Sequence, residues 1–150
     1  MPPTEAAEPG PRLVARLIDT LVVGLPVVAV VQGAGLSAEL VLPLALPGLL
    51  LVYEAVQLAL WGRTLGKRLT GLAVVPQPDA GRSRLDPARA ALRAATYALP
   101  LAAQPVPVLD VLAGLFWVGN AAFALEEPRR QALHDRLAGT RVIAVTASSG

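Results

Sequence analysis

Apolar residues in this chain are gathered into long runs that are separated by short polar segments. From Leu40 to Gly62 the only charged residue is Glu54, and from Ala94 to Leu125 it is Asp110. Runs of 18 or more residues with so few charges are long enough to cross the roughly 30 Å hydrocarbon core of a bilayer as helices. The pattern therefore predicts an all-α membrane protein that is embedded in a lipid bilayer.

These runs predict about four transmembrane helices, over residues 13–31, 40–61, 89–104 and 107–125. The last two are separated because the stretch 90–125, some 36 residues, is too long for one crossing at about 1.5 Å per residue, and because Pro105 and Pro107 favour a turn. The segment 89–104 is the weakest of the four. The alternative is three spans plus a re-entrant or interfacial helix.

The segments outside the spans divide the chain further. The transmembrane domain is expected over residues 12–146. A tail rich in Pro and Gly precedes it, a polar loop interrupts it, and a short polar tail follows it; these cover residues 1–11, 62–88 and 147–150.

Basic residues fix the predicted orientation. All 13 Lys and Arg residues fall on one side of the four-span arrangement, and the two turns on the other side contain none. The positive-inside rule assigns the basic side to the cytoplasm, so both termini are expected there. The many Arg, Ala, Gly and Pro residues are typical of a GC-rich bacterial genome, which predicts a multi-pass protein of the bacterial inner (cell) membrane.

Composition also excludes several functions. The chain has no Cys and one His, His134, so disulfides, zinc–thiolate sites and multi-His metal sites are ruled out. No Ser has a catalytic motif around it, and we expect no enzyme activity, cofactor or bound metal. The pI is about 9.7, but the net charge is only +2 and the basic residues flank spans. Membrane orientation explains them better than nucleic-acid binding does.

Charged residues within spans are the main functional candidates. Arg12, Ala15, Arg16 and Asp19 share one helix face. A carboxylate at the depth of Asp19 is costly unless it is paired, solvated or protonated. Asp19 could form a cation or proton site, or an ion pair with Arg16 that only fixes helix rotation. Glu54 is expected at a comparable depth, and two carboxylates in one pocket would suit proton or cation exchange.

Two segments of the chain are similar to each other. The sequences GRTLGKRLTGLAVV (62–75) and ALHDRLAGTRVIAV (132–145) align at an offset of 68 residues. This alignment predicts a degenerate duplication in which the two Val-rich ends pair as a cytoplasmic β-ribbon. The two segments supply a candidate cytoplasmic motif of Gly66, Lys67, Arg68, His134, Arg136, Gly139 and Thr140.

The motif Arg12-x-x-Ala15-x-x-Ile18-Asp19, followed by the two similar segments, resembles the RDD family of small bacterial membrane proteins. That family is named for one arginine and two aspartates, and Arg12, Asp19 and Asp135 stand at those positions. The resemblance implies a multi-pass inner-membrane domain. Transport is often proposed for such proteins, and cation/proton exchange for some. It also draws attention to Asp135, which we expect to pair with Arg12 and so tie the ends of the chain together.

The leading functional prediction is a small transport component for a cation, proton or small solute, with Asp19 and Glu54 near the pathway. Four short helices leave little room for an enclosed route, so a homo-oligomer is expected, with Gly24, Gly48 and Gly114 permitting close helix contacts. The alternative is a non-transporting adaptor or scaffold. It would dock a cytoplasmic protein or anionic lipid through its basic loop and C-terminal segment.

Overall fold

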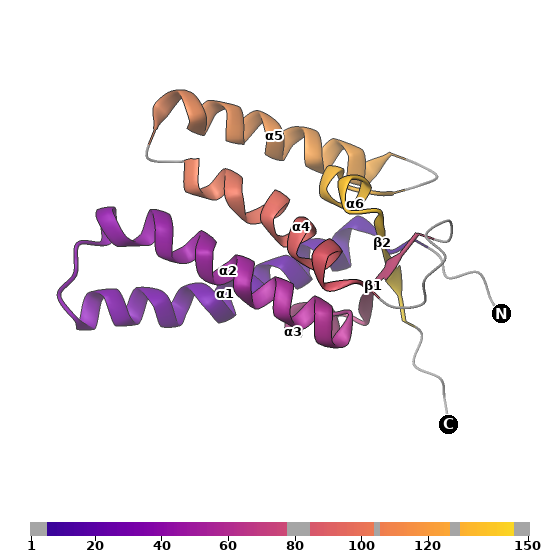
Figure 1. Ribbon diagram of the computed structural model, residues 1–150, viewed down its shortest axis with the longest axis horizontal. Coiled ribbons are helices and arrows are strands. Elements are labelled where there is room, and N and C mark those ends of the chain that lie inside the picture. Colours follow the sequence, from indigo (N-terminus) through magenta and orange to yellow (C-terminus); the bar gives the residue numbers. More distant parts are fainter. Residues whose placement is uncertain (1–5, 78–84, 104–105, 127–129, 146–150) are drawn as a thin grey trace.

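A computed structural model describes residues 6–77, 85–103, 106–126 and 130–145. Parts of the predicted tails and loop, and the predicted break at Gln104 and Pro105, lie outside these residues. Three long helices are apolar enough to cross a membrane: α1 (Pro9–Gly33), α2 (Ala38–Trp61) and α5 (Pro107–Leu125). The shorter elements are α3 (Leu65–Leu69), β1 (Leu72–Pro76), α4 (Pro87–Ala98), the 3₁₀ helix η2 (Leu99–Ala103), α6 (Leu133–Leu137) and β2 (Thr140–Ala144) (Figure 1).

The predicted third span over 89–104 is instead a shorter helix with a 3₁₀ extension. Helix α4 has 12 residues, about 18 Å at 1.5 Å per residue, which is less than the thickness of a hydrocarbon core. It also carries Arg89 and Arg93, and Arg93 is buried. Of the two arrangements predicted from the sequence, three candidate spans plus a further helix is the one observed.

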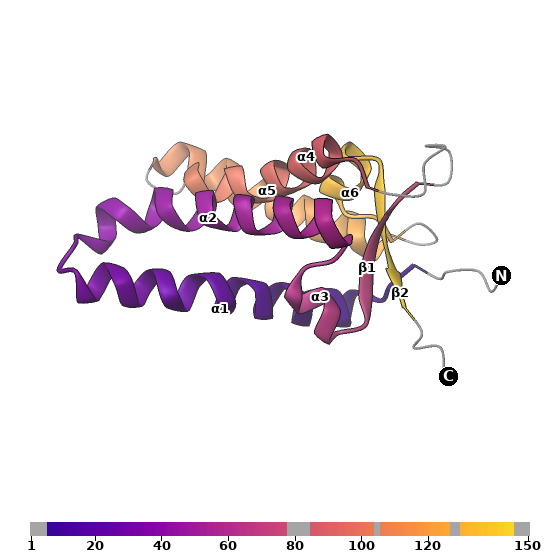
Figure 2. The same cartoon turned by 60° about the horizontal axis from the view of Figure 1, so that its bottom comes forward.

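The helices form a bundle whose two ends differ. Helices α1 and α2 form a hairpin, and α4 packs along α2 (Figures 1 and 2). Helix α5 lies at the outer edge of the bundle, where it packs mainly against η2 and α6 and touches α4 through Trp117 and Tyr97. The short elements α3, β1, α6 and β2 gather at the end where α1 begins and α2 and α5 finish.

The predicted β-ribbon is present as a two-stranded antiparallel sheet. Leu72 lies opposite Ala144, and Val74 lies opposite Val142. Each strand follows a glycine with a positive φ, Gly71 or Gly139, a conformation that other residues adopt only at a cost. Both α3 with β1 and α6 with β2 obey the 68-residue offset of the sequence alignment. Val74 and Val142, equivalent positions in the two segments, therefore face each other.

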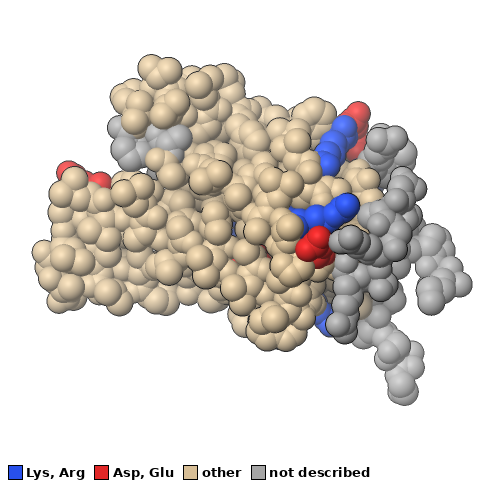
Figure 3. Space-filling view, viewed as in Figure 1, with Lys and Arg blue, Asp and Glu red and all other residues tan. Residues whose placement is uncertain are grey.

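The packed core lies at the ribbon end of the bundle, where buried apolar residues include Ala15, Leu58, Leu72 and Val142. Away from this end the helices expose Leu and Val, and α5 buries only Ala113 and Asn120. In Figure 3 the visible Lys and Arg side chains also gather at the ribbon end. An apolar belt with the described basic residues confined to one end is the surface expected of helices that cross a bilayer.

Candidate functional site

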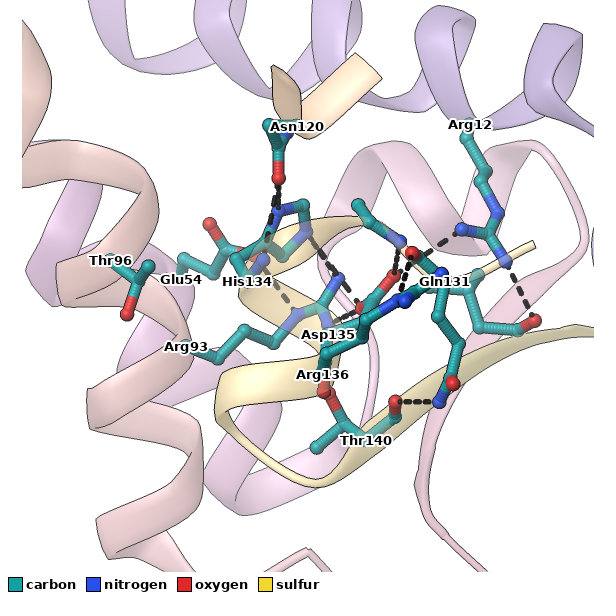
Figure 4. A network of polar contacts seen from close by, with 12 residues as sticks. Arg12, Glu54, Arg93, Thr96, Asn120, Gln131, His134, Asp135, Arg136 and Thr140 are labelled. Carbon is teal, nitrogen blue, oxygen red and sulfur yellow. Dashed lines mark hydrogen bonds and ion pairs between the residues drawn. The ribbon is translucent and has the colours of Figure 1, made fainter. Parts of the chain in front are cut away.

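Charged side chains from five helices meet inside the ribbon end of the bundle (Figure 4). Burying a charge is costly unless the charge is paired and hydrogen-bonded. We refer to seven of these residues, together with the neighbouring His134, as the charged network: Arg12, Arg16, Asp19, Glu54, Lys67, Arg93, His134 and Asp135.

Asp19 binds the start of α3. One carboxylate oxygen of Asp19 accepts from the Tyr53 hydroxyl at 2.8 Å and from the Gly66 backbone N–H at 2.8 Å. The other accepts from the Thr64 hydroxyl at 2.6 Å. Gly66 has to be small here, because a Cβ would lie 2.9 Å from Asp19 Oδ1 and collide with the backbone of Ala15. The sequence had suggested Gly66 only as part of a motif.

Glu54 is the main partner of Arg16. The two terminal nitrogens of the Arg16 guanidinium donate to the two oxygens of Glu54, at 2.6 and 3.1 Å. The Arg16–Asp19 ion pair, one of the two alternatives predicted for Asp19, is not the arrangement observed, because the Arg16 side chain extends from α1 across to Glu54 of α2. Arg93 Nε also lies 3.8 Å from Glu54. With Lys67 of α3, described next, this carboxylate is paired with cations from three other helices.

Lys67 joins the two intramembrane carboxylates. Its Nζ lies 3.5 Å from Glu54 Oε1 and 4.0 Å from Asp19 Oδ2. Burial lowers the pKa of Lys67 to about 8, and attraction to Glu54 offsets only part of that effect. Lysines lose a proton when buried far more readily than arginines do. Lys67 is consequently a charged group that can change its protonation state close to neutral pH.

Asp135, at the first turn of α6, pairs with arginines from two other helices. It pairs with Arg93 of α4 and, at 3.3 Å, with Arg12 of α1. It also accepts from the Ala132 N–H at 3.1 Å, which caps α6. Arg93 donates further to the Thr140 hydroxyl at 2.9 Å. The Arg12–Asp135 pair expected from the sequence is therefore present, with Arg93 as an additional partner.

His134 has a defined tautomer. Arg93 approaches His134 Nε2 at 3.1 Å and can only donate, so Nε2 is the acceptor. The proton is then on Nδ1, which donates to the Asn120 side-chain oxygen at 2.8 Å. Burial, followed by repulsion from Arg93 and Arg16, holds the pKa of His134 well below its usual value. The imidazole is neutral at pH 7 and ties α5 to α6.

Tyr97 of α4 was not predicted from the sequence, yet it touches three neighbours in the site. The Arg16 guanidinium lies 3.5 Å from the centre of its ring, a cation–π contact. Trp117 of α5 meets the same ring edge-on, with centroids 4.4 Å apart, and His134 meets it at 5.8 Å. Asn120 was missed as well, although an amide within an apolar span is a signal that the sequence offered.

The remaining motif residues lie in different surroundings. Arg68 is exposed and stacks over Trp61, while Arg136 pairs with Glu126 over the ring of Phe123. Gly139 forms the turn before β2, and Thr140 joins the charged network through Arg93. The structure thus brings together Arg12, Arg16, Asp19, Glu54, Lys67, His134, Thr140 and Asp135, but not Arg68 or Arg136. Among the described residues no group of three or more His, Cys, Asp or Glu is arranged to hold a metal ion.

Three candidate spans and a buried charged network at one end define a multi-pass membrane protein. The chain belongs to the RDD family: the family model matches residues 6–139, which covers both aspartates and the arginine of the family pattern. Comparisons with curated proteins and with solved structures found no match.

Proposed function

We propose that this protein is a small transport component that exchanges protons through the charged network. The observation that carries the proposal is the position of Lys67 between Glu54 and Asp19, with its pKa lowered to about 8. A proton can leave or join this group near neutral pH, while the neighbouring arginines keep their charge. The proposed role is not enzymatic.

Proton exchange fits the geometry better than direct binding of a metal cation. Asp19 already accepts three hydrogen bonds, and Glu54 is held by both terminal nitrogens of Arg16. A cation would have to displace these donors and would then lie among the arginines. A small solute or cation carried alongside the proton is compatible with the same network.

The proposed orientation places the ribbon end in the cytoplasm of a bacterial cell, with both termini inside. The described Lys and Arg residues all lie in or next to the elements of that end, as the positive-inside rule requires. A homo-oligomer is part of the proposal, because a single bundle of this size has little room for an enclosed route. A Cβ added at Gly48 or Gly114 would meet nothing within 4 Å, so both positions offer places for close helix contact.

The decisive experiment is flux in proteoliposomes of the purified protein. A pH gradient is imposed, Na⁺, K⁺ or Li⁺ is added in turn, and a pH-sensitive dye reports its dissipation. We expect Asp19→Asn and Glu54→Gln to abolish flux when equal amounts of folded protein are reconstituted. Arg68→Gln is the matched control, since Arg68 neighbours Lys67 in the chain but is exposed. No flux from well-folded wild-type protein would contradict the proposal.

A non-transporting adaptor is the second candidate. It is favoured by the number of bonds that the buried carboxylates already make, because such a network can serve structure alone. An adaptor would dock a cytoplasmic protein or anionic lipid through basic residues at the surface, such as the exposed Arg68 and the half-buried Arg136. Changes at those two positions would then abolish function, whereas Asp19→Asn would act only through stability.

A further inference from the structure

A crevice opens between α1 and α5 at the ribbon end of the bundle. Its volume is about 460 Å³, within the roughly 300–1,000 Å³ typical of small-molecule sites. One wall is α1, the other is α5, and the floor is the charged network. Helix α5 packs mainly against η2 and α6, and the space between α5 and α1 is open.

The floor of this crevice carries an excess of positive charge. Four cations, Arg12, Arg16, Lys67 and Arg93, stand against the three carboxylates of the network. Arg12 and Arg16 keep 13% and 17% of their side chains exposed, so both can be reached from the crevice. The buried Nε atom of Arg12 has no hydrogen-bond partner among the described residues. The site is therefore suited to an anion.

The walls of the crevice are apolar. Leu13 of α1 is 72% exposed and Leu125 of α5 is 63% exposed, and both line the opening. Ala121 and Ala124 of α5 add small side chains that leave room beside the helix. Cations therefore lie at the floor, close to the charged end of the protein, and hydrocarbon surface lies beside them. An anionic phospholipid has the same order of groups, with a phosphate next to acyl chains.

We propose that the crevice between α1 and α5 binds one anionic phospholipid from the surrounding leaflet, with its phosphate at Arg12 and Arg16 and an acyl chain against α5. This site lies inside the bundle and differs from the exposed basic loop through which an adaptor would meet lipid. The proposal does not depend on proton exchange, because binding is measured without flux.

The test is native mass spectrometry of the full protein, released from micelles that contain phosphatidylglycerol or phosphatidylcholine. We expect phosphatidylglycerol to be retained preferentially by the wild type. Ala124→Trp, which fills the crevice without touching a charge, should lower retention at least tenfold. Ala122→Trp is the matched control, since Ala122 is exposed on the same helix outside the crevice and should leave retention unchanged. Arg12→Gln should lower retention by roughly fivefold, the effect of one basic residue at an anionic lipid.

Four results would overturn the proposal. Equal retention of the two lipids, or equal loss in both Trp variants, would show that the crevice does not select an anionic lipid. Competition by glycerol phosphate as strong as that by phosphatidylglycerol would show a site for a free anion. Loss of the homo-oligomer in Ala124→Trp alone, with lipid retention intact, would show that a second copy of the chain occupies the crevice.

Discussion

The two halves of the molecule share one order of elements but bury their charges in opposite ways. In the first half, the long helix α1 carries the carboxylate Asp19, and the start of α3 donates to it. In the second half, α4 carries the cation Arg93, and Asp135 of α6 accepts from it. Lys67 and Asp135 occupy equivalent positions in the 68-residue alignment. This position carries a cation in the first half and an anion in the second. Charged residues of each half therefore pair with opposite charges of the other half.

The halves also differ in how closely their helices pack. In the first half α3 lies against α1, and Gly66 is in contact with the Ala15 backbone. In the second half α4 ends after 12 residues, and most of α5 is exposed. The tightly packed half holds the intramembrane carboxylates, while the open half leaves the crevice beside them. The close packing around the carboxylates thus lies in the first half of the chain, and the opening that leads to the charged network lies beside α5 of the second half.

The largest expected effect compares the two aspartates. Asp135→Asn leaves Arg12 and Arg93 without their shared carboxylate, and removing one partner of a buried pair costs about 3–5 kcal/mol of unfolding free energy. Asp19→Asn should cost only about 1–3 kcal/mol, because its closest donors are the uncharged Tyr53, Thr64 and Gly66. Denaturant unfolding in detergent micelles measures both. Equal losses of unfolding free energy in the two variants would show that the two aspartates do not differ in their dependence on charged partners.

Packing in the two halves is compared by adding one methyl group to each. Gly66→Ala forces a Cβ against the backbone of Ala15 and should cost about 1–3 kcal/mol or more. Gly114→Ala in α5 is the matched control, because nothing lies within 4 Å of its Cβ position. It should change stability by less than about 1 kcal/mol, or raise it. A thermal shift assay on both variants separates these outcomes, and a tolerated Gly66→Ala would contradict the close contact of α3 with α1.

Acid should weaken the link between α5 and α6. The pKa of His134 is held well below its ordinary value of about 6.5. The unfolded chain therefore binds a proton that the folded chain does not, and stability falls as pH drops below about 6.5, by about 1.4 kcal/mol per unit. We expect His134→Gln to lose this part of the pH dependence between pH values of about 7.5 and 5.5. An unchanged slope in the variant would show that other groups cause it.

The smallest effect is expected outside the charged network. Arg136 pairs with Glu126 at the surface, and exposed pairs contribute about 0–1 kcal/mol. Arg136→Gln should therefore barely change the unfolding midpoint. Arg16→Gln should lower the midpoint strongly, because Glu54 loses both hydrogen bonds that Arg16 donates. Adding about 0.5 M salt should abolish what effect Arg136→Gln has, because exposed charges are screened. A large drop of the unfolding midpoint in Arg136→Gln would show that the stabilising charged network includes this surface pair.

The sequence predicted the parts of this structure that depend on local pattern. Hydropathy located the three long helices, and the repeated segments located the β-ribbon with its 68-residue offset. The family pattern identified Asp135, whose pairing with Arg12 was also predicted. A fourth span was predicted over 89–104 because apolar residues fill most of that range, although its first turns carry Arg89 and Arg93.

The partners of the buried charges were harder to predict, because they depend on how the helices are rotated against each other. Arg16 and Asp19 share one face of α1, yet each binds a different element. Lys67 and Arg93 flank long apolar runs, where basic residues usually face water and lipid headgroups. Their burial follows from the way α3 and α4 pack against the long helices, which one chain without aligned relatives does not reveal.

The position of Asp135 has a consequence for how the protein is made. Helix α6 follows all three candidate spans in the chain, so the ribosome releases it after the spans have been synthesised. Until then Arg12 and Arg93 lack the carboxylate that neutralises them. The bundle can therefore complete its core only when translation has passed residue 135, and a nascent chain stalled earlier would present unpaired arginines to the cell's membrane proteases.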